Sequence, residues 1–540
     1  MINRWLIALV VLLMAGASGE VMAQKSKKSV AKASKKYAKY VNDKAKGKEK
    51  LAQKRSSDPA TVTREQDSIV VEEQDPMRTA YEQFKQQATT EYENFRDKAN
   101  AEYAEFMKQA WEQFYAKPAV PQPVEKDIPP VVVQEDEQPK PIEDKPLPIE
   151  DEIVTIPAPE PQPVPVAPIK EQPVVEEESV AFTVYGSALK VRFTSDERFR
   201  LADCSEKTLS EAWKRLSGTA YNNTIRDCLE LRIKRQFSDW AYLNMLKCFS
   251  KAALGNGNEA VLLMAYIYCQ TGYRMRLGVL DGQLYMLYGS KHVIFNKAYY
   301  PIDDDYYYIL DSDIFSLKIC NIAYPKEKSL SLYVPNDQQF DYVASDVRHL
   351  KSKRYPQMDI TSQVNKNLIA FCDGYPKSSI WDNVMSRWAM LANMPMEKRL
   401  KEHLYPQLQE VIKGQSQKES MERLLNWVQT SLVYEYDDKV WGGDRAFFAE
   451  ESLYYPYADC EDRSILLSRL VRDLLGLKTI LIYYPGHLAM AVEFTEDVRG
   501  DYIMLDGRKF VVCDPTYINA LVGMTMPKMD NSSAKVILLE

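Results

Sequence analysis

The fold of the C-terminal part of the chain is decided by residues 454–517, which read YYPYADCEDRSILLSRLVRDLLGLKTILIYYPGHLAMAVEFTEDVRGDYIMLDGRKFVVCDPTY. From Cys460 onward, apolar residues recur at the spacing of one helical face, which predicts a helix that begins at this residue. Two apolar runs then predict strands at 479–484 and 488–494, and a hairpin around Asp506-Gly507 follows. A helix followed by paired strands places this part in the α+β class.

Three residues with the chemistry of a catalytic triad fall at the ends of these elements. Cys460 opens the predicted helix, His487 begins a strand and Asp514 ends one. A helix N-terminus and an imidazolium both favour a thiolate, and an acid on the far ring nitrogen orients the imidazole. Glu461 and Asp462 oppose this, because like charge raises the pKa of the thiol unless they point away. Each triad residue also has a purely structural interpretation, as a buried thiol, a hydrogen-bonded strand-end histidine or a turn residue.

The segments ADCEDRSILLSRL, PGHLAMAV and VVCDPTY resemble the Cys, His and Asp motifs of the transglutaminase-like superfamily, which has a papain-like fold. The resemblance implies that Cys460 is the nucleophile, His487 the base and acid, and Asp514 the orienting carboxylate. Members of the superfamily include amide transferases, peptidases and inactive binding domains. The function implied is thiol-dependent acyl transfer on peptide or protein amides, by hydrolysis or transamidation. The alternative is a non-catalytic envelope scaffold or a peptide- or glycan-binding protein.

Further site residues are expected just before the nucleophile. The backbone N–H of Cys460 is one natural donor to an oxyanion. The resemblance implies a second donor from an upstream side chain, and both Tyr455 and Tyr457 are candidates. Loops in this region shape the acyl pocket of the family, so Trp441 and Phe447 are expected either in the pocket wall or in the core.

Cysteines and histidines give no metal-binding pattern. The eight cysteines include no CxxC pair, and the four histidines are not clustered. Most cysteines are expected to be small buried residues, although a disulfide between Cys204 and Cys228 stays open. We expect no cofactor and no metal requirement, with calcium not excluded.

An upstream segment repeats the nucleophile region. Residues 256–286 align without gaps on residues 460–490, and seven positions are identical. The offset is constant, since Gly272 and Gly476 are 204 residues apart. The alignment predicts a second copy of the same fold.

The upstream copy has lost the catalytic residue types. Asn256 stands at the position of the nucleophile and Gln283 at that of the histidine, while Asp311 falls opposite the triad aspartate with a one-residue shift. Neither Asn nor Gln acts as a nucleophile or general base near neutral pH. We expect a degenerate transglutaminase-like domain that either recognises peptide or glycan or only supports packing.

The N-terminal part differs in composition. Arg4, an apolar core and small residues before position 24 are typical of a secretory signal peptide, so a soluble periplasmic or extracellular protein is expected. The net charge of −7 conceals a lysine-rich stretch after this peptide. That stretch is either a disordered tail or a contact for anionic envelope polymer. Zinc-finger spacing and a basic recognition helix are both missing, so nucleic-acid binding is not expected.

A Tyr-x-x-Phe unit at Tyr81, Tyr92 and Tyr103 recurs every 11 residues, and Trp111–Phe114 follows out of step. Eleven residues make three helical turns, so we expect a striped helix that self-associates or packs on the C-terminal domains. The expected segments are a signal peptide (1–23), a basic tail (24–63), the aromatic-striped helix (64–116), an extended Pro- and acid-rich linker (117–178), the degenerate domain (179–335), a connecting region (336–400) and the catalytic domain (401–540).

Overall fold

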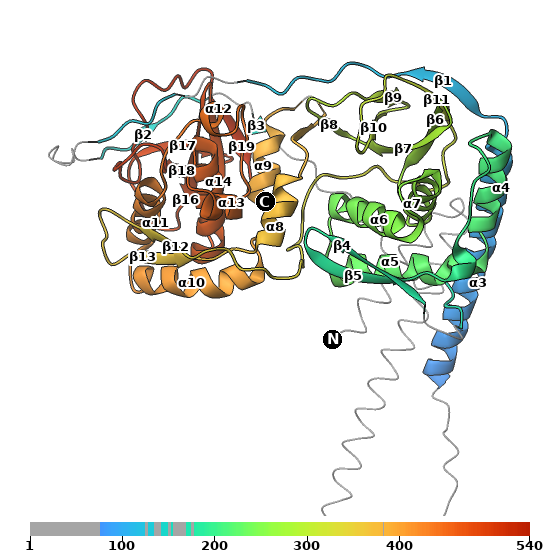
Figure 1. The fold of residues 1–540 in the computed structure, drawn as a ribbon. Coiled ribbons are helices and arrows are strands. Elements are labelled where there is room, and N and C mark those ends of the chain that lie inside the picture. Colours follow the sequence, from blue (N-terminus) through green and yellow to red (C-terminus); the bar gives the residue numbers. More distant parts are fainter. Residues whose placement is uncertain are drawn as a thin grey trace, which may run out of the picture. The chain divides into compact units, whose positions relative to one another are not determined.

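The computed structural model describes residues 76–124, 128–133, 142–149, 153–154, 169–173, 178–381 and 383–540. The expected signal peptide and basic tail lie outside these residues. Within them the chain is mixed α+β, with several sheets and many helices (Figure 1). None of the described helices has the length and apolarity needed to span a bilayer.

The C-terminal part is built on a seven-stranded sheet of order β2-β17-β18-β16-β15-β19-β3. Its strands are β15 (Lys478–Tyr484), β16 (His487–Glu493), β17 (Asp501–Leu505), β18 (Arg508–Val512), β19 (Lys535–Leu538), β2 (Lys145–Pro146) and β3 (Ile153–Val154). The turn between β17 and β18 is Asp506-Gly507, and both residues have positive φ, as a tight hairpin turn requires.

Helix α14 (Cys460–Leu475) packs against β15 and β16 (Figure 1). It starts where the sequence predicts and ends at Gly476, which adopts the left-handed conformation (φ 65°) that favours glycine. Its apolar face, including Ile465, Leu466 and Leu470, is completely buried. The surrounding elements are α8 (Lys366–Asp373), α9 (Ser386–Asn393), α10 (Lys398–Ile412), α11 (Gln417–Ser431), α12 (Asp437–Val440), α13 (Ala449–Tyr454), β12 (Arg348–Lys351) and β13 (Asp359–Ser362).

The upstream part is built on a six-stranded sheet of order β1-β11-β6-β7-β10-β9. Its strands are β1 (Trp111–Tyr115), β6 (Met275–Leu280), β7 (Gln283–Ser290), β9 (Tyr300–Ile302), β10 (Asp305–Ile309) and β11 (Ser316–Cys320). The elements around it are α4 (Glu206–Leu216), α5 (Asn222–Lys234), α6 (Asp239–Leu254), α7 (Asn258–Gln270), the hairpin β4 (Ser179–Val184) with β5 (Ser187–Arg192), and the pair β8 (His292–Ile294) with β14 (Ser378–Ile380).

Five strands of the two sheets correspond in order and in direction. The upstream order β11-β6-β7-β10-β9 matches the C-terminal order β19-β15-β16-β18-β17, and every neighbouring pair in both is antiparallel. Along the chain, helix α7 directly precedes β6 in the upstream part, and helix α14 directly precedes β15 in the C-terminal part. The same sequence of elements therefore occurs twice along the chain.

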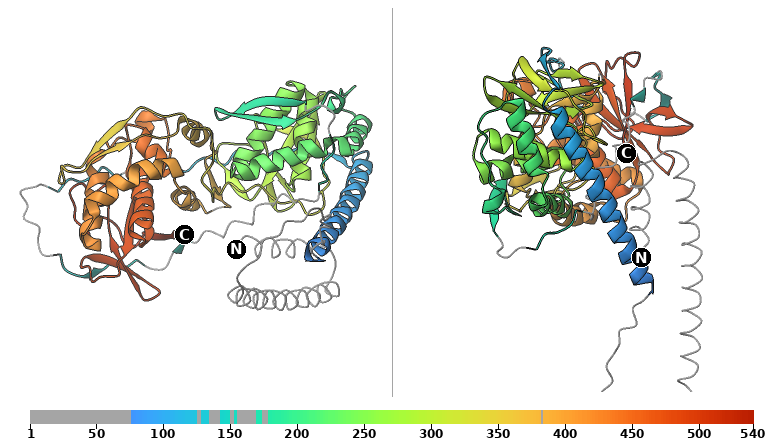
Figure 2. Two further views of the ribbon diagram at one scale, coloured as in Figure 1. Left: turned by 90° about the horizontal axis from the view of Figure 1, so that it is seen from below. Right: turned by 90° about the vertical axis from the view of Figure 1, so that its right-hand side faces the viewer.

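The aromatic-striped helix ends earlier than expected. Helix α3 runs from Pro76 to Phe106, and Figure 2 shows it as one long helix. The out-of-step unit Trp111–Phe114 is not helical, because it pairs as strand β1 with the edge strand β11. Tyr103 is 2% exposed and its ring lies 4.7 Å from that of Trp213, whereas Phe106 is 58% exposed. Tyr92 and Tyr103 thus pack on the upstream core, whereas Phe95 and Phe106, each three residues further along the helix, are exposed.

The described pieces of the linker are extended and pair with strands of the sheets. β2 adds in parallel to β17, and β3 adds in parallel to β19. In the upstream part, Lys117 donates its backbone N–H to Tyr299 O (2.7 Å). Edge strands present unpaired N–H and C=O groups, which an extended segment can satisfy. The linker is therefore part of both folded regions rather than a detached spacer.

The two faces of α3 predict different costs of truncation. Tyr103→Ala should lower the free energy of unfolding by about 3 kcal/mol, because it removes a buried ring from the core. Phe106→Ala, the matched control three residues on, should change it by less than about 0.5 kcal/mol. Urea unfolding followed by tryptophan fluorescence measures both. Equal losses would contradict the burial of the tyrosine side of the stripe.

Candidate functional site

Cys460 is the first residue of α14 and is 1% exposed. The preceding residue, Asp459, caps the helix: its side chain accepts from the backbone N–H of Asp462, and the side chain of Asp462 accepts from the N–H of Asp459. This reciprocal capping box fixes the first turn of the helix. The sulfur is thus attached to a rigid helix N-terminus, where the helix dipole favours a negative charge.

His487 and Asp514 form a buried hydrogen-bonded pair. His487 Nε2 lies 2.8 Å from Asp514 Oδ2, and both residues are 2% exposed. The second carboxylate oxygen, Oδ1, accepts from the backbone N–H groups of Thr516 (2.8 Å) and Tyr517 (3.2 Å). His487 Nδ1 is buried and forms no hydrogen bond with any described residue. The carboxylate is therefore held by the backbone, and it holds one ring nitrogen while the other stays open to a reacting group.

A hydrogen bond ties the nucleophile helix to the histidine strand. Ser464 Oγ donates to Leu488 O at 2.8 Å. Ser464 follows Cys460 by one helical turn on the same face of α14, and Leu488 directly follows His487. The start of α14 and the start of β16 are consequently fixed side by side, as a thiol and its base require.

Two buried residues that sequence reasoning missed hold these segments together. Gln429 on α11 directs its Nε2 at the carbonyls of Asp514 (3.1 Å), Tyr517 (2.8 Å) and Ala520 (3.3 Å). Gln429 follows Leu425 by four residues on the apolar face of its helix. A polar residue on this face was the sequence signal from which its buried role could have been predicted.

Arg463 forms the second link. It joins α14 to α11 and to the segment just before Cys460. Its guanidinium donates to the carbonyls of Ala458 (3.2 Å), Gln429 (3.0 Å) and Leu432 (2.9 Å). Burial lowers the pKa of Arg463 to about 10. Both ends of the site, the Cys460 turn and the Asp514 loop, are thus bonded to the same helix, α11.

Three of the four accessory candidates form one aromatic cluster. The ring centroid of Trp441 lies 5.7 Å from that of Phe447 and 4.8 Å from that of Tyr455. The guanidinium of Arg445 lies over all three rings. The Tyr455 hydroxyl donates to Asp373 Oδ1 (2.6 Å), so its proton is already used there. Tyr457, the fourth candidate, is 38% exposed.

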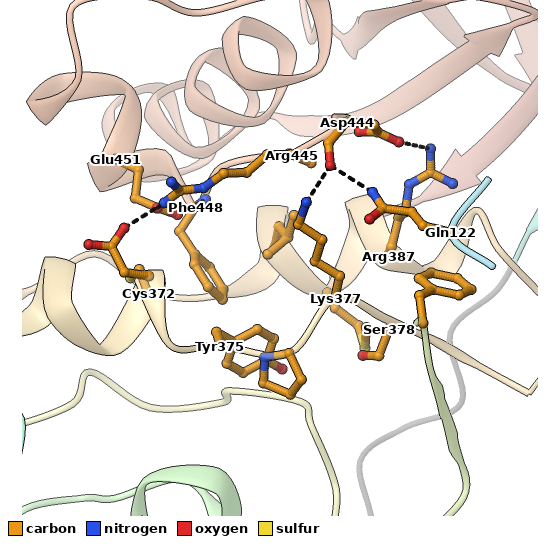
Figure 3. A pocket seen from close by; sticks show the side chains of 16 residues that line it. Gln122, Cys372, Tyr375, Lys377, Ser378, Arg387, Asp444, Arg445, Phe448 and Glu451 are labelled. Carbon is orange, nitrogen blue, oxygen red and sulfur yellow. Dashed lines mark hydrogen bonds and ion pairs between the residues drawn. The ribbon is translucent and has the colours of Figure 1, made fainter. Parts of the chain in front are cut away.

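The cluster adjoins a cavity of about 170 Å³ (Figure 3). Arg445 lies along it and pairs with Asp373 and with Glu451, each at 2.6 Å. Lys377 Nζ and Gln122 Nε2 both donate to the backbone carbonyl of Asp444 (Figure 3). Cys460, His487 and Asp514 are not among the residues that line this cavity. It is a neighbouring feature, not the space around the thiol.

A linker segment lies against both loops that carry the triad. Ile128 donates its N–H to Gly486 O (2.8 Å), next to His487. Val131 and Val133 exchange backbone hydrogen bonds with Ile518, four residues after Asp514. The three residues are almost completely buried, and residues 128–133 lie beside the turn before His487 and the loop after Asp514.

The degenerate site is an open cavity in the upstream part. Asn256, Gln283 and Asp311 all line one cavity of about 360 Å³. The residue that contacts Gln283 is Asn258, whose Oδ1 accepts from Gln283 Nε2 at 2.8 Å. Helix α7 begins at Asn258, two residues later than the alignment with the start of α14 predicts.

All eight cysteines are reduced, so the disulfide between Cys204 and Cys228 that the sequence left open is not formed. Asn258 Nδ2 donates to Cys204 Sγ instead (3.0 Å). Cys513, which directly follows β18, is completely buried.

Gln429→Leu should lower the free energy of unfolding by about 2 kcal/mol, because three buried carbonyls lose their donor. Hydrogen exchange at the N–H groups of Thr516 and Tyr517 should accelerate, since the loop that presents Asp514 loses its anchor. Gln409→Leu, at an exposed position on helix α10, is the control and should change neither quantity appreciably. Unchanged exchange at both amides in the Gln429 variant would show that α11 does not hold the loop.

Comparison with known proteins places no constraint on this site. No family model, no curated protein and no solved structure matches the chain. What the site can do chemically is therefore argued from its own geometry.

Proposed function

We propose that residues 401–540 form a transglutaminase-like domain that catalyses thiol-dependent acyl transfer on peptide or protein amides. The observation that carries this proposal is the state of the His487 ring. One nitrogen is bonded to Asp514, and the other is buried without a hydrogen-bond partner on a strand fixed beside the start of the Cys460 helix. The unpartnered nitrogen alone does not distinguish His487, because His292 Nδ1 is buried in the same way. What distinguishes His487 is that a carboxylate holds its ring beside the start of the Cys460 helix.

The reaction follows from the roles of the three residues. Cys460 Sγ gives its proton to His487 Nδ1 and attacks the amide carbonyl carbon, and a C–S bond forms as the carbonyl becomes an oxyanion. His487 gives its Nδ1 proton to the leaving amine when the C–N bond breaks, which leaves a thioester on the sulfur. Water or an amine then attacks the thioester, His487 takes the proton of that nucleophile, and the thiol is regenerated. Asp514 keeps the imidazole oriented throughout.

The backbone N–H at the start of α14 and Tyr457 are the proposed oxyanion donors. Peptide hydrolysis is the first outcome we propose, and transamidation is the second. On the composition of residues 1–23, we also propose that the protein is exported.

We propose that residues 179–335 are a degenerate copy of the same domain. The corresponding strand orders support this, and so does the ungapped repeat in the sequence. Both copies have their amide or imidazole side chain at the first position of the equivalent strand, Gln283 on β7 and His487 on β16. Duplication followed by loss of the reactive groups accounts for both similarities.

The upstream cavity favours a second candidate function, non-catalytic recognition of peptide or glycan. The cavity is lined by Asn256 and Gln283, by apolar side chains such as Met264 and Leu284, and by Lys247, which pairs with Asp311. Amide groups beside an apolar wall suit a ligand with both polar and apolar faces. This function is compatible with catalysis in the C-terminal domain, and it would be the whole function if the triad is inactive.

Cys460→Ser should abolish cleavage of a peptide library and incorporation of a fluorescent amine, with a loss of at least about 10³-fold, because the hydroxyl is a far weaker nucleophile here. Cys513→Ser, a buried thiol next to the triad aspartate, is the matched control and should keep most of the activity. Mass spectrometry of the library and fluorescence of the acceptor protein report the two reactions. Equal activity of the wild type and Cys460→Ser, or none in either, would reject the enzymatic proposal.

Gln283→Trp should fill the mouth of the upstream cavity and weaken binding of peptide or glycan array ligands at least tenfold. The same ligands should still bind Cys460→Ser, because the two sites are separate. Fluorescence anisotropy with the array hits measures the affinities. If no ligand binds, or if binding is lost in Cys460→Ser but not in Gln283→Trp, the upstream domain is a packing support.

A further inference from the structure

The cavity beside the aromatic cluster has no part in the proposed reaction. It has a volume of about 170 Å³ and is bordered by helices α8, α9 and α13 and by residues 444–448 (Figure 3). Its apolar wall includes Tyr375 and Phe448, whose ring centroids lie 5.1 Å apart, and Met390, which is 3% exposed. An apolar cavity of about 150 Å³ accommodates benzene. The space is therefore large enough for one six-membered ring with a small substituent.

The arginines around this cavity are paired with carboxylates of its own wall. Arg445 forms ion pairs with Asp373 and Glu451, each at 2.6 Å. Arg387 lies 3.4 Å from Asp444 Oδ2. Burial raises the pKa of Glu451 to about 7, so near neutral pH this carboxyl is protonated in a fraction of the molecules. The positive charge of the two guanidinium groups is thus compensated within the wall.

Lys377 is the cation of this wall without a carboxylate partner. Its Nζ donates to the backbone carbonyl of Asp444 at 2.6 Å (Figure 3), and no carboxylate of a described residue forms an ion pair with it. An ammonium carries three N–H donors, and this bond uses one of them. Partial burial lowers the pKa of Lys377, because the surroundings do not fully compensate its charge. An anion in the cavity would supply the missing compensation.

Ser378, the next residue, carries a polar atom that no described protein group satisfies. It is 4% exposed and lines the cavity, and its Oγ is buried without a hydrogen-bond partner among the described residues. Buried hydroxyl groups normally have a partner. An ammonium and a hydroxyl, both donors, therefore lie on neighbouring residues beside an apolar wall.

We propose that this cavity binds a small carboxylate that carries an aromatic ring. The ring would lie against Tyr375 and Phe448, because aromatic rings favour edge-to-face and offset contacts with one another. The carboxylate would accept from Lys377 Nζ and Ser378 Oγ, and hydrogen bonds between ionised groups are stronger than neutral ones. A free aromatic acid and the carboxyl end of a peptide with a C-terminal aromatic residue share this chemistry. Binding here does not depend on the proposed acyl transfer, so the site would remain in a chain that lacks that activity.

Calorimetry and thermal melting of the full chain test the site with sodium phenylacetate as the probe. The wild type should bind one phenylacetate and melt at a higher temperature when saturated, because a ligand of the folded state stabilises it. Phenylacetamide has the same shape without the charge, and acetate lacks the ring, so each should bind at least about tenfold more weakly. No saturable binding of phenylacetate up to about 10 mM, or equal binding of phenylacetamide, would overturn the proposal.

Lys377→Met removes the charge and keeps an unbranched side chain. It should weaken phenylacetate binding at least about tenfold and leave phenylacetamide binding within about twofold. Lys366→Met, at the exposed start of α8 and outside the cavity wall, is the matched control and should bind as the wild type does. Without ligand, both variants should melt within about 2 °C of the wild type, which separates loss of the site from loss of the fold. Equal phenylacetate affinity of the wild type and Lys377→Met would contradict the proposal.

N-acetylphenylalanine represents the carboxyl end of a peptide and separates the two sources of the ligand. If phenylacetate binds more tightly, the cavity takes a free acid, which its volume favours. If N-acetylphenylalanine binds more tightly, the cavity takes a peptide end. Either order supports a site for a ring with a carboxylate, and binding of neither compound would reject it.

Discussion

The hydrogen bond between His487 and Asp514 is the constraint on which the site depends. It joins the first residue of β16 to the loop after β18, and it is buried on every side. Asp514 is in turn bonded to the backbone of Thr516 and Tyr517, and Gln429 holds the carbonyls of that loop. A carboxylate with this many fixed donors cannot reorient without breaking several bonds, so the ring that it holds is fixed as well.

Helix α11 links the parts of the site that lie far apart in the sequence. The Gln429 side chain donates to the Asp514 loop, and the Gln429 backbone carbonyl accepts from Arg463. Arg463 directly follows Asp462, the last residue of the capping box of α14. Rigidity at the site and burial of the site have the same origin, because the network that fixes the residues also fills the space around them. The linker adds to this burial at Gly486 and Ile518. The acyl transfer that we propose would need the buried sulfur to become accessible, and residues 128–133 are hydrogen-bonded to both neighbouring loops, at Gly486 and at Ile518.

The local elements of the site could be predicted from the sequence, and the contacts between them could not. Apolar periodicity predicted a helix beginning at Cys460, and Pro485-Gly486 predicted the turn before His487; both positions agree with the structure to within a residue. The roles of Gln429 and Arg463 arise from contacts more than thirty residues away in the chain, which no local pattern encodes. Trp111–Tyr115 is a strand for the same reason, since its partner β11 is remote in the sequence. The start of α7 at Asn258 also differs from the alignment. An ungapped alignment matches the apolar positions of two helices, and it does not show where each helix begins.

The central claim is that a sulfur on a helix tip and an imidazole held by a carboxylate meet within reacting distance. A crystal structure of the full chain, at a resolution that places each side-chain atom, measures this directly through the separation of Cys460 Sγ and His487 Nδ1. The account predicts a separation of no more than about 4 Å, the looser end of what a resting nucleophile and base show, with Nε2 still on Asp514. A separation beyond about 6 Å, or a protein donor or acceptor bonded to Nδ1 in place of the thiol, would contradict it.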